Sequence, residues 1–234
     1  MNHPAPSALR YFEEVSESIR AEISSGRLQP GDKLPAERQL AAAYGVGRYT
    51  VREALRSLEM SGLVNMRKGA KGGAFISQGN AGGVAQSLTD LVSVGGSSLE
   101  ELTEARTLLL QLAVELVCDR ATEPELDAIM NNVEELRQRV RERDADGRLL
   151  AIERFFHLIG EATHNRAVLT LVNSMSQAVR PTMIKAGPKA EAGVVDSHQS
   201  IAMALASRDK ARSKTAMGEH LIRLHKYLHS KLVG

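Results

Sequence analysis

The chain has 234 residues, a net charge of +2, one cysteine, no tryptophan and only 3% aromatic residues. One cysteine excludes an intrachain disulfide, no apolar run reaches the roughly 20 residues that span a bilayer, and the first residues lack the order of a secretory signal. We therefore expect a cytoplasmic protein without membrane contact, whose aliphatic cores favour helices over β-sandwiches.

The charge is distributed unevenly along the chain. Residues 1–77 hold 11 basic and 8 acidic side chains, whereas the remainder holds 19 and 20. The basic excess concentrates in one stretch, which carries Arg48, Arg52, Arg56, Arg67, Lys68 and Lys71 against only Glu53 and Glu59. A short basic patch is what contact with phosphate requires, although most such runs are solvated surface.

Helical periodicity begins near the N-terminus. A first amphipathic helix ends near Gly26 and places on one face Phe12, Val15, Ile19 and Ile23. After a turn at 29–32, a second helix is predicted to start at Pro35, which suits a first helical position, and to stop at Gly45. Glu37 in its opening turn complements the helix dipole.

A third helix is predicted to begin about three residues after Gly45 and to end at 61–62. Its apolar stripe consists of Val51, Ala54, Leu55 and Leu58. The outward face then carries Tyr49, Arg52, Glu53 and Arg56. Two β-prone pieces, 63–66 and 74–76, flank a glycine-rich basic loop and indicate a hairpin. Helix, tight turn, helix and hairpin is the order of a winged helix-turn-helix, which binds DNA.

The segment 78–83 is rich in glycine and is predicted to be a linker. Seven helical patterns follow it, at 84–94, 98–120, 123–143, 148–163, 167–185, 190–207 and 209–232. Helices joined by short loops predict an all-α antiparallel bundle. The expected fold is thus mainly α, with a winged helix-turn-helix domain at 1–77 and a helical domain at 84–234.

Three stretches of the first domain, 26–41, 45–55 and 59–64, resemble the signature of the GntR family of transcriptional regulators. The resemblance implies phosphate and base contacts, and with the outward-facing Tyr49 the predicted DNA-binding residues are Arg38, Arg48, Tyr49, Thr50 and Arg52. It also implies that Lys68 and Gly69 lie at the wing tip, in or near the minor groove. Members of the family bind short palindromes as homodimers. Ala36 and Gly47 depart from the pattern, which commonly has Ser or Thr there.

The helical domain resembles the FCD effector domain at 99–106, 153–157, 161–165, 197–205 and 218–221. The resemblance implies a divalent metal ion, and the matching ligand positions are Glu153, His157, His198 and His220. Glu153 and His157 are four residues apart and share a helix face. Glu stands where the family usually has Asp. Such ligands suit Zn, Ni, Fe or Mn.

The same resemblance implies that Arg106 receives the carboxylate of a small organic-acid effector. Asn165 is a second candidate contact. Alternatives remain open: Arg106 could instead pair with Glu101 or Glu104, and Asn165 could cap a helix. The sequence predicts a ligand-responsive transcriptional regulator, with a repressor favoured, and no enzyme. The competing interpretations are a DNA-binding protein without metal or effector, and a metal-dependent enzyme built on the helical domain.

Overall fold

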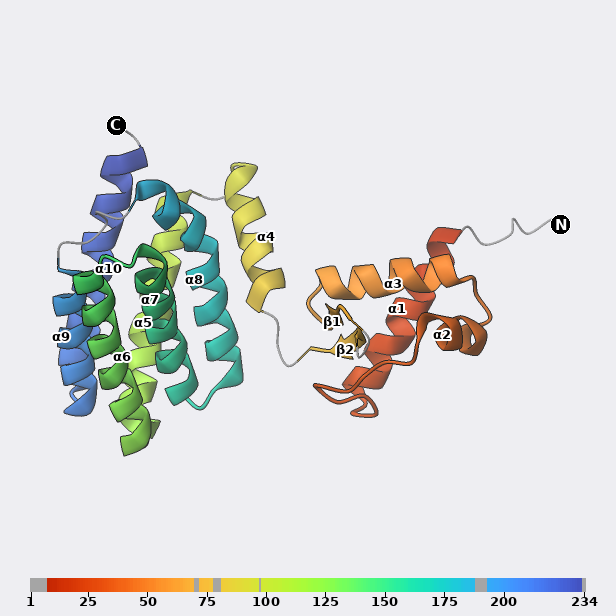
Figure 1. Ribbon diagram of the computed structural model, residues 1–234, viewed down its shortest axis with the longest axis horizontal. Helices are drawn as coiled ribbons and strands as arrows, with labels where there is room; N and C mark the ends of the chain where they lie inside the picture. Colours follow the sequence, from red (N-terminus) through yellow and green to blue (C-terminus); the bar gives the residue numbers. More distant parts are fainter. Residues whose placement is uncertain (1–7, 70–71, 78–80, 97, 188–192, 233–234) are drawn as a thin grey trace. The chain divides into compact units, whose positions relative to one another are not determined.

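The computed structural model describes residues 8–69, 72–77, 81–96, 98–187 and 193–232 (Figure 1). The chain divides into two compact units, Met1–Val84 and Ala85–Gly234. The first contains three helices and a hairpin, and the second is helical throughout its described part. This confirms the mainly α fold class expected from the sequence.

The first unit is a helix-turn-helix followed by a hairpin. Its elements are α1 (Ala8–Ser24), α2 (Glu37–Tyr44), α3 (Arg48–Met60), β1 (Val64–Arg67) and β2 (Gly73–Ile76). The two strands are antiparallel, with Val64 opposite Ile76. Lys33 adds an isolated bridge to Phe75, so the segment before α2 lies against the hairpin.

The third helix forms the centre of this unit. Its predicted stripe is buried, since Val51, Ala54 and Leu58 are each 0% exposed. Around them pack apolar side chains of the other elements, including Val15, Ile19, Leu40, Val64 and Ile76. Burial of each such side chain contributes roughly 1.5–3 kcal/mol. The core therefore fixes which face of α3 points outward.

The start of α2 differs from the prediction. Pro35 was expected to be the first helical residue, but this is wrong: Ala36 is the N-cap, with an extended ψ of 149°, and Glu37 is the first helical residue. The reason is local, because the side-chain oxygen of Gln39 accepts a hydrogen bond from the Ala36 N–H at 3.0 Å. That bond ties the third helical residue to the N-cap. At the other end Gly45, at φ +65°, stops the helix as predicted.

The second unit is an antiparallel bundle (Figure 1). Its elements are α4 (Ala81–Ser93), α5 (Leu99–Arg120), α6 (Glu123–Glu142), α7 (Ala145–Ala162), α8 (Arg166–Ala186), α9 (Val194–Ala206) and α10 (Lys210–Leu232). Because α5 contacts α7, α8, α9 and α10, it is the central helix of the bundle. In the described part of the chain, no helix is both long and apolar enough to cross a membrane.

Two helix starts differ from those expected, and a third lies partly outside the described residues. Residues 81–83, expected in the linker, form the first turn of α4, and 78–80 lie outside the described residues. Helix α7 begins at Ala145 because Asp144 caps it, accepting from the Gly147 N–H at 2.9 Å. The described part of α9 begins at Val194. The earlier part of its predicted span lies largely in 188–192, outside the described residues.

Candidate functional site

Five of the predicted DNA-binding residues lie on α2 and α3. Arg38, Arg48 and Arg52 are exposed, Tyr49 is 70% exposed and Thr50 is half-buried. The first residue of α3 is Arg48, so its side chain lies at the N-terminus of the helix. A helix-turn-helix presents this end of its second helix to the major groove.

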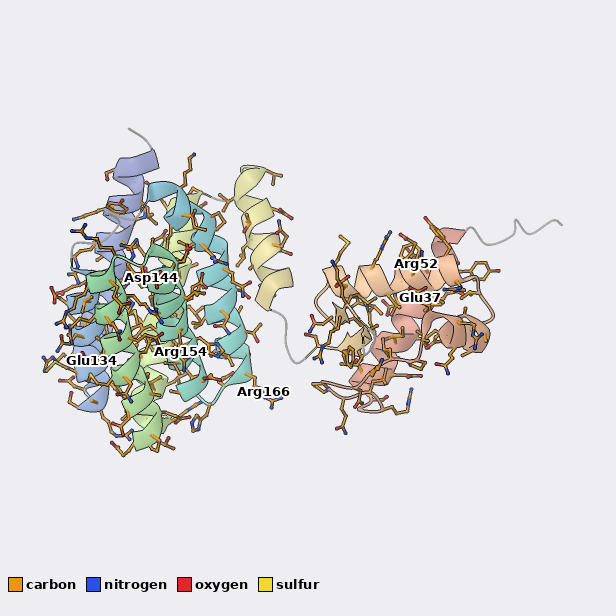
Figure 2. All side chains as sticks on the ribbon, in the orientation of Figure 1. Glu37, Arg52, Glu134, Asp144, Arg154 and Arg166 are labelled. Atoms are coloured by element: carbon orange, nitrogen blue, oxygen red, sulfur yellow. The ribbon has the colours of Figure 1, made fainter. Side chains whose placement is uncertain are left out.

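Glu37 joins two of these arginines, a contact that the sequence did not reveal. The Arg52 Nε lies 3.3 Å from Oε1 of Glu37, and the Arg52 Nη2 lies 3.1 Å from Oε2. The Arg48 Nη2 is 3.7 Å from the same Oε2. Figure 2 shows Arg52 and Glu37 next to each other where α2 meets α3. The hydrogen bonds that Arg52 donates to Glu37 lower the pKa of Glu37 and raise the pKa of Arg52.

The other flank of α3 borders a hollow with mixed polar and apolar lining. A hollow of about 570 Å³ is lined by Phe12, Tyr49, Thr50, Glu53, Arg56, Ser57 and Met60. Tyr49 and Thr50 therefore line a hollow shared with α1, whereas Arg48 and Arg52 lie toward Glu37 and α2. The predicted DNA-binding residues of α3 thus divide between two flanks of the helix.

The wing carries an arrangement of basic and aromatic side chains. Lys68 and Gly69 are exposed, and Gly69 has a φ of +101°, which suits glycine in a tight turn. The Arg67 guanidinium lies 4.3 Å from the centre of the Phe75 ring, and the Lys33 ammonium lies 5.5 Å from it. These cation–π contacts hold two basic groups beside the hairpin. The sequence analysis included neither Lys33 nor Phe75 among the predicted DNA-binding residues.

In the helical domain, one aromatic cluster brings together three of the predicted residues. Arg106, His198 and His220 are 3%, 0% and 2% exposed. The two imidazole centres are 4.9 Å apart, and Phe156 packs against both histidines and Arg106. The ring of Phe156 is 4.7 Å from the guanidinium carbon and 6.0 Å from the His220 ring. Phe155 lies 4.2 Å from His198.

Burial favours the neutral form of both histidines, and the ring nitrogens of each have different surroundings. His198 Nδ1 lies 2.9 Å from the Val194 carbonyl oxygen. Because a carbonyl only accepts, Nδ1 holds the proton and Nε2 holds the lone pair. Burial lowers the pKa of His198 to about 4 and the pKa of His220 well below its usual value. Among the described residues, neither Nε2 has a hydrogen-bond partner.

The other two predicted metal ligands have different partners. Glu153 Oε1 lies 2.9 Å from Nε of Arg180 on α8. His157 Nδ1 lies 3.2 Å from the Asn173 oxygen, also on α8, and its Nε2 lies 3.4 Å from Glu161. Within the described ranges, no three His, Cys, Asp or Glu side chains come close enough to hold a metal ion. The histidine pair fits a metal site, whereas Glu153 and His157 are engaged with α8 and Glu161.

Asn165 is the N-cap of α8. Its side-chain oxygen accepts from the backbone N–H groups of Ala167 and Val168 at 3.0 and 3.2 Å. This is the capping geometry that the sequence left open as an alternative. Arg106 is buried over Phe156, while Glu101 and Glu104 on the same helix are exposed.

The fold and these surfaces define a class of protein: a winged helix-turn-helix regulator with a helical C-terminal domain. Residues 12–76 match the family described as "Bacterial regulatory proteins, gntR family", and residues 101–223 match the FCD domain. The chain therefore belongs to the GntR family, in the branch that carries an FCD domain. It is a DNA-binding transcriptional regulator.

Two bacterial regulators match the chain over most of their length. The Uxu operon transcriptional regulator of Escherichia coli is 32% identical over 225 residues, which cover 93% of this chain and 86% of the relative. The HTH-type transcriptional regulator LutR of Bacillus subtilis is 29% identical, with 85% and 92% covered. These relatives are regulators, which confirms that the chain is no enzyme.

A solved structure shows the same fold. A GntR protein of Streptococcus agalactiae superimposes with a TM-score of 0.64 at 24% identity, covering 92% of this chain and 99% of that one.

Proposed function

We propose that the protein is a cytoplasmic repressor that binds a short palindromic operator as a homodimer and is controlled by a small carboxylate effector. The observation that carries this proposal is the pairing, in one chain, of an exposed arginine surface on α3 with a buried cluster of Arg106, His198 and His220. A single winged helix reads few base pairs, so a second copy is needed for a unique site.

On the DNA side, each residue has a role that follows from its chemistry. Arg48 and Arg52 read base edges, because the planar guanidinium matches guanine O6 and N7. Arg38 and Thr50 contact phosphates, and Tyr49 contacts the DNA backbone beside the hollow between α1 and α3. Lys68 and Gly69 approach the minor groove from the wing. Phosphate contacts release counterions, so affinity falls steeply with salt.

In the helical domain, Arg106 binds the effector carboxylate. His198 and His220 would hold a divalent metal ion (Zn, Ni, Fe or Mn) through their Nε2 atoms, which are buried and have no partner among the described residues. Glu153 and His157 complete the ligand set only if they leave Arg180, Asn173 and Glu161. When bound, the metal supplies a second positive centre for the carboxylate. Asn165 is a further candidate effector contact.

The experiment is selection of duplexes from a random DNA pool with the full-length protein. Wild type is expected to recover a palindromic consensus. Arg48→Ala and Arg52→Ala should each lose about 5-fold to 160-fold of the preference for the consensus over a scrambled duplex, since a bidentate base contact contributes roughly 1–3 kcal/mol of discrimination. Arg56→Ala is the matched control, because Arg56 pairs with Glu53 on its own helix. Failure of wild type to select a consensus contradicts the proposal.

A second candidate is a regulator whose helical domain only dimerises and binds neither metal nor effector. The partners of Glu153 and His157 on α8 favour it, because they occupy two of the four predicted ligands.

A further inference from the structure

We propose that Glu37 is a positioning residue for DNA recognition: it fixes which edge of Arg52 faces the DNA and thereby sharpens sequence selectivity. The inference rests on the proposed function, in which Arg48 and Arg52 read bases, and extends it to a residue that does not itself contact a base.

The argument begins with the two hydrogen bonds between Arg52 and Glu37. They engage Nε and Nη2, which form one side of the guanidinium fork, at 3.3 and 3.1 Å. A guanidinium has five N–H donors. The end-on edge, made by Nη1 and the second hydrogen of Nη2, stays available for a base. Its two parallel donors match O6 and N7 of guanine. Glu37 therefore binds the side edge of the Arg52 guanidinium and leaves the end-on edge available for a base.

The carboxylate is well suited to this task because it is held by a different helix. Glu37 is the first residue of α2, and Arg52 lies 15 residues later on α3. The Glu37 side chain is 26% exposed, and Arg48 adds a second positive group at 3.7 Å from Oε2. The N-terminus of α2 further favours a negative charge. These contacts hold the pKa of Glu37 below its usual value, so the pair stays charged.

The charge of Glu37 also acts against unspecific binding. A carboxylate beside the recognition helix repels DNA phosphates, and this repulsion is present on every sequence. The end-on contact from Arg52 to guanine offsets this repulsion only at a site that has guanine in the matching position. Replacement of Glu37 by Gln keeps the shape, removes the charge and weakens the fork. We expect tighter binding to unspecific DNA together with weaker discrimination.

The test uses the full-length protein and two probes, the consensus duplex selected by wild type and a scrambled duplex of equal length. Selectivity is the Kd for the scrambled duplex divided by the Kd for the consensus duplex. For Glu37→Gln this ratio should fall about 5-fold or more, and the Kd for the scrambled duplex should decrease. When the selection is repeated with Glu37→Gln, the consensus should be less well defined than that of wild type at guanine positions and unchanged at the others. Glu53→Gln is the matched control, since it removes one carboxylate from an Arg–Glu pair of 3.1 Å on α3.

The outcomes separate the inference from the proposed function. No consensus for wild type refutes the proposed function. A wild-type consensus that Glu37→Gln recovers unchanged, with the same Kd ratio as Glu53→Gln, overturns the inference alone. Should Glu37→Gln fail to fold, the variant Glu37→Asp provides the test. Aspartate keeps the negative charge, but its side chain is one methylene shorter. Selectivity below wild type supports positioning by Glu37, and selectivity equal to wild type overturns it.

Discussion

Ala36 and Gly47 precede the two helices of the DNA-reading motif, and neither has a side chain that accepts a hydrogen bond. At α2 only half of a capping box exists, since Gln39 accepts from the Ala36 N–H but no side chain returns the bond. At α3 Gly47 has an extended backbone, and a Cβ there would meet only the Thr50 hydroxyl, at 3.9 Å. A side-chain acceptor at either N-cap position should therefore stabilise the helix that follows it.

The capping argument predicts that Ala36→Ser stabilises the start of α2 by about 1 kcal/mol, because serine completes the box. Hydrogen exchange of the α2 amides should slow about five-fold, the factor that corresponds to this free energy. Ala43→Ser is the control: Ala43 is exposed inside the same helix, where serine is slightly unfavourable. Equal exchange in both variants would contradict the capping argument.

Single residues also show what the sequence could and could not supply. The outward position of Arg52 follows from the stripe of α3, which periodicity alone predicts. Its partner Glu37 could not be predicted, because the contact depends on the angle between two helices. His198 and His220 were found through family resemblance. Their burial against Phe155 and Phe156, and the engagement of Glu153 with Arg180, depend on packing that no local pattern contains.

At the scale of elements, helix lengths were predicted well and helix ends less well. The bundle helices follow strong apolar periodicity, and α5, α6 and α10 start or end within a residue or two of the prediction. Side-chain hydrogen bonds set the starts of α2 and α7: Gln39 accepts from the Ala36 N–H, and Asp144 caps α7. Such local bonds compete with periodicity. Pro181 lies inside α8, which nevertheless continues to Ala186.

The contact between α7 and α8 is close at Gly160, and this leads to a paired prediction. A Cβ at Gly160 would lie 2.9 Å from Leu169 Cδ1 and 3.3 Å from its Cα, whereas a Cβ at Gly218 meets only the end of the Gln111 side chain. Gly160→Ala should destabilise the helical domain by about 1–2 kcal/mol through crowding. Gly218→Ala should be neutral or stabilising by up to about 1 kcal/mol from helix propensity.

Guanidinium unfolding followed by far-ultraviolet circular dichroism measures both variants against wild type. A lower midpoint for Gly160→Ala alone supports the close approach of the two helices. A gain in stability at Gly160 would show that α7 and α8 have space to separate.

At the scale of the whole molecule, two units with separate cores must influence each other if an effector controls DNA binding. Linkage makes this influence reciprocal: the factor by which an effector changes operator affinity equals the factor by which operator changes effector affinity. The buried cluster at Arg106 and the arginine surface on α3 are the two sites to compare.

We predict that at least one small organic acid raises the melting temperature of the full-length protein, because a ligand that binds the native state stabilises it by mass action. A thermal-shift screen with and without chelator identifies the acid and its metal dependence. Arg106→Gln should abolish the shift while leaving DNA binding intact. The acid should then weaken operator binding, and operator should weaken acid binding equally. An acid that binds at Arg106 but leaves operator affinity unchanged would contradict effector control.

The ion pair between Glu37 and Arg52 also has an evolutionary consequence. A regulator that acquires a new operator must alter its base-reading side chains, and loss of Arg52 alone would leave the Glu37 carboxylate facing DNA without its partner. Loss of Glu37 alone would leave an arginine that binds many sequences. Substitutions at the two positions should therefore be inherited together among descendants of this protein, although 15 residues of sequence separate them.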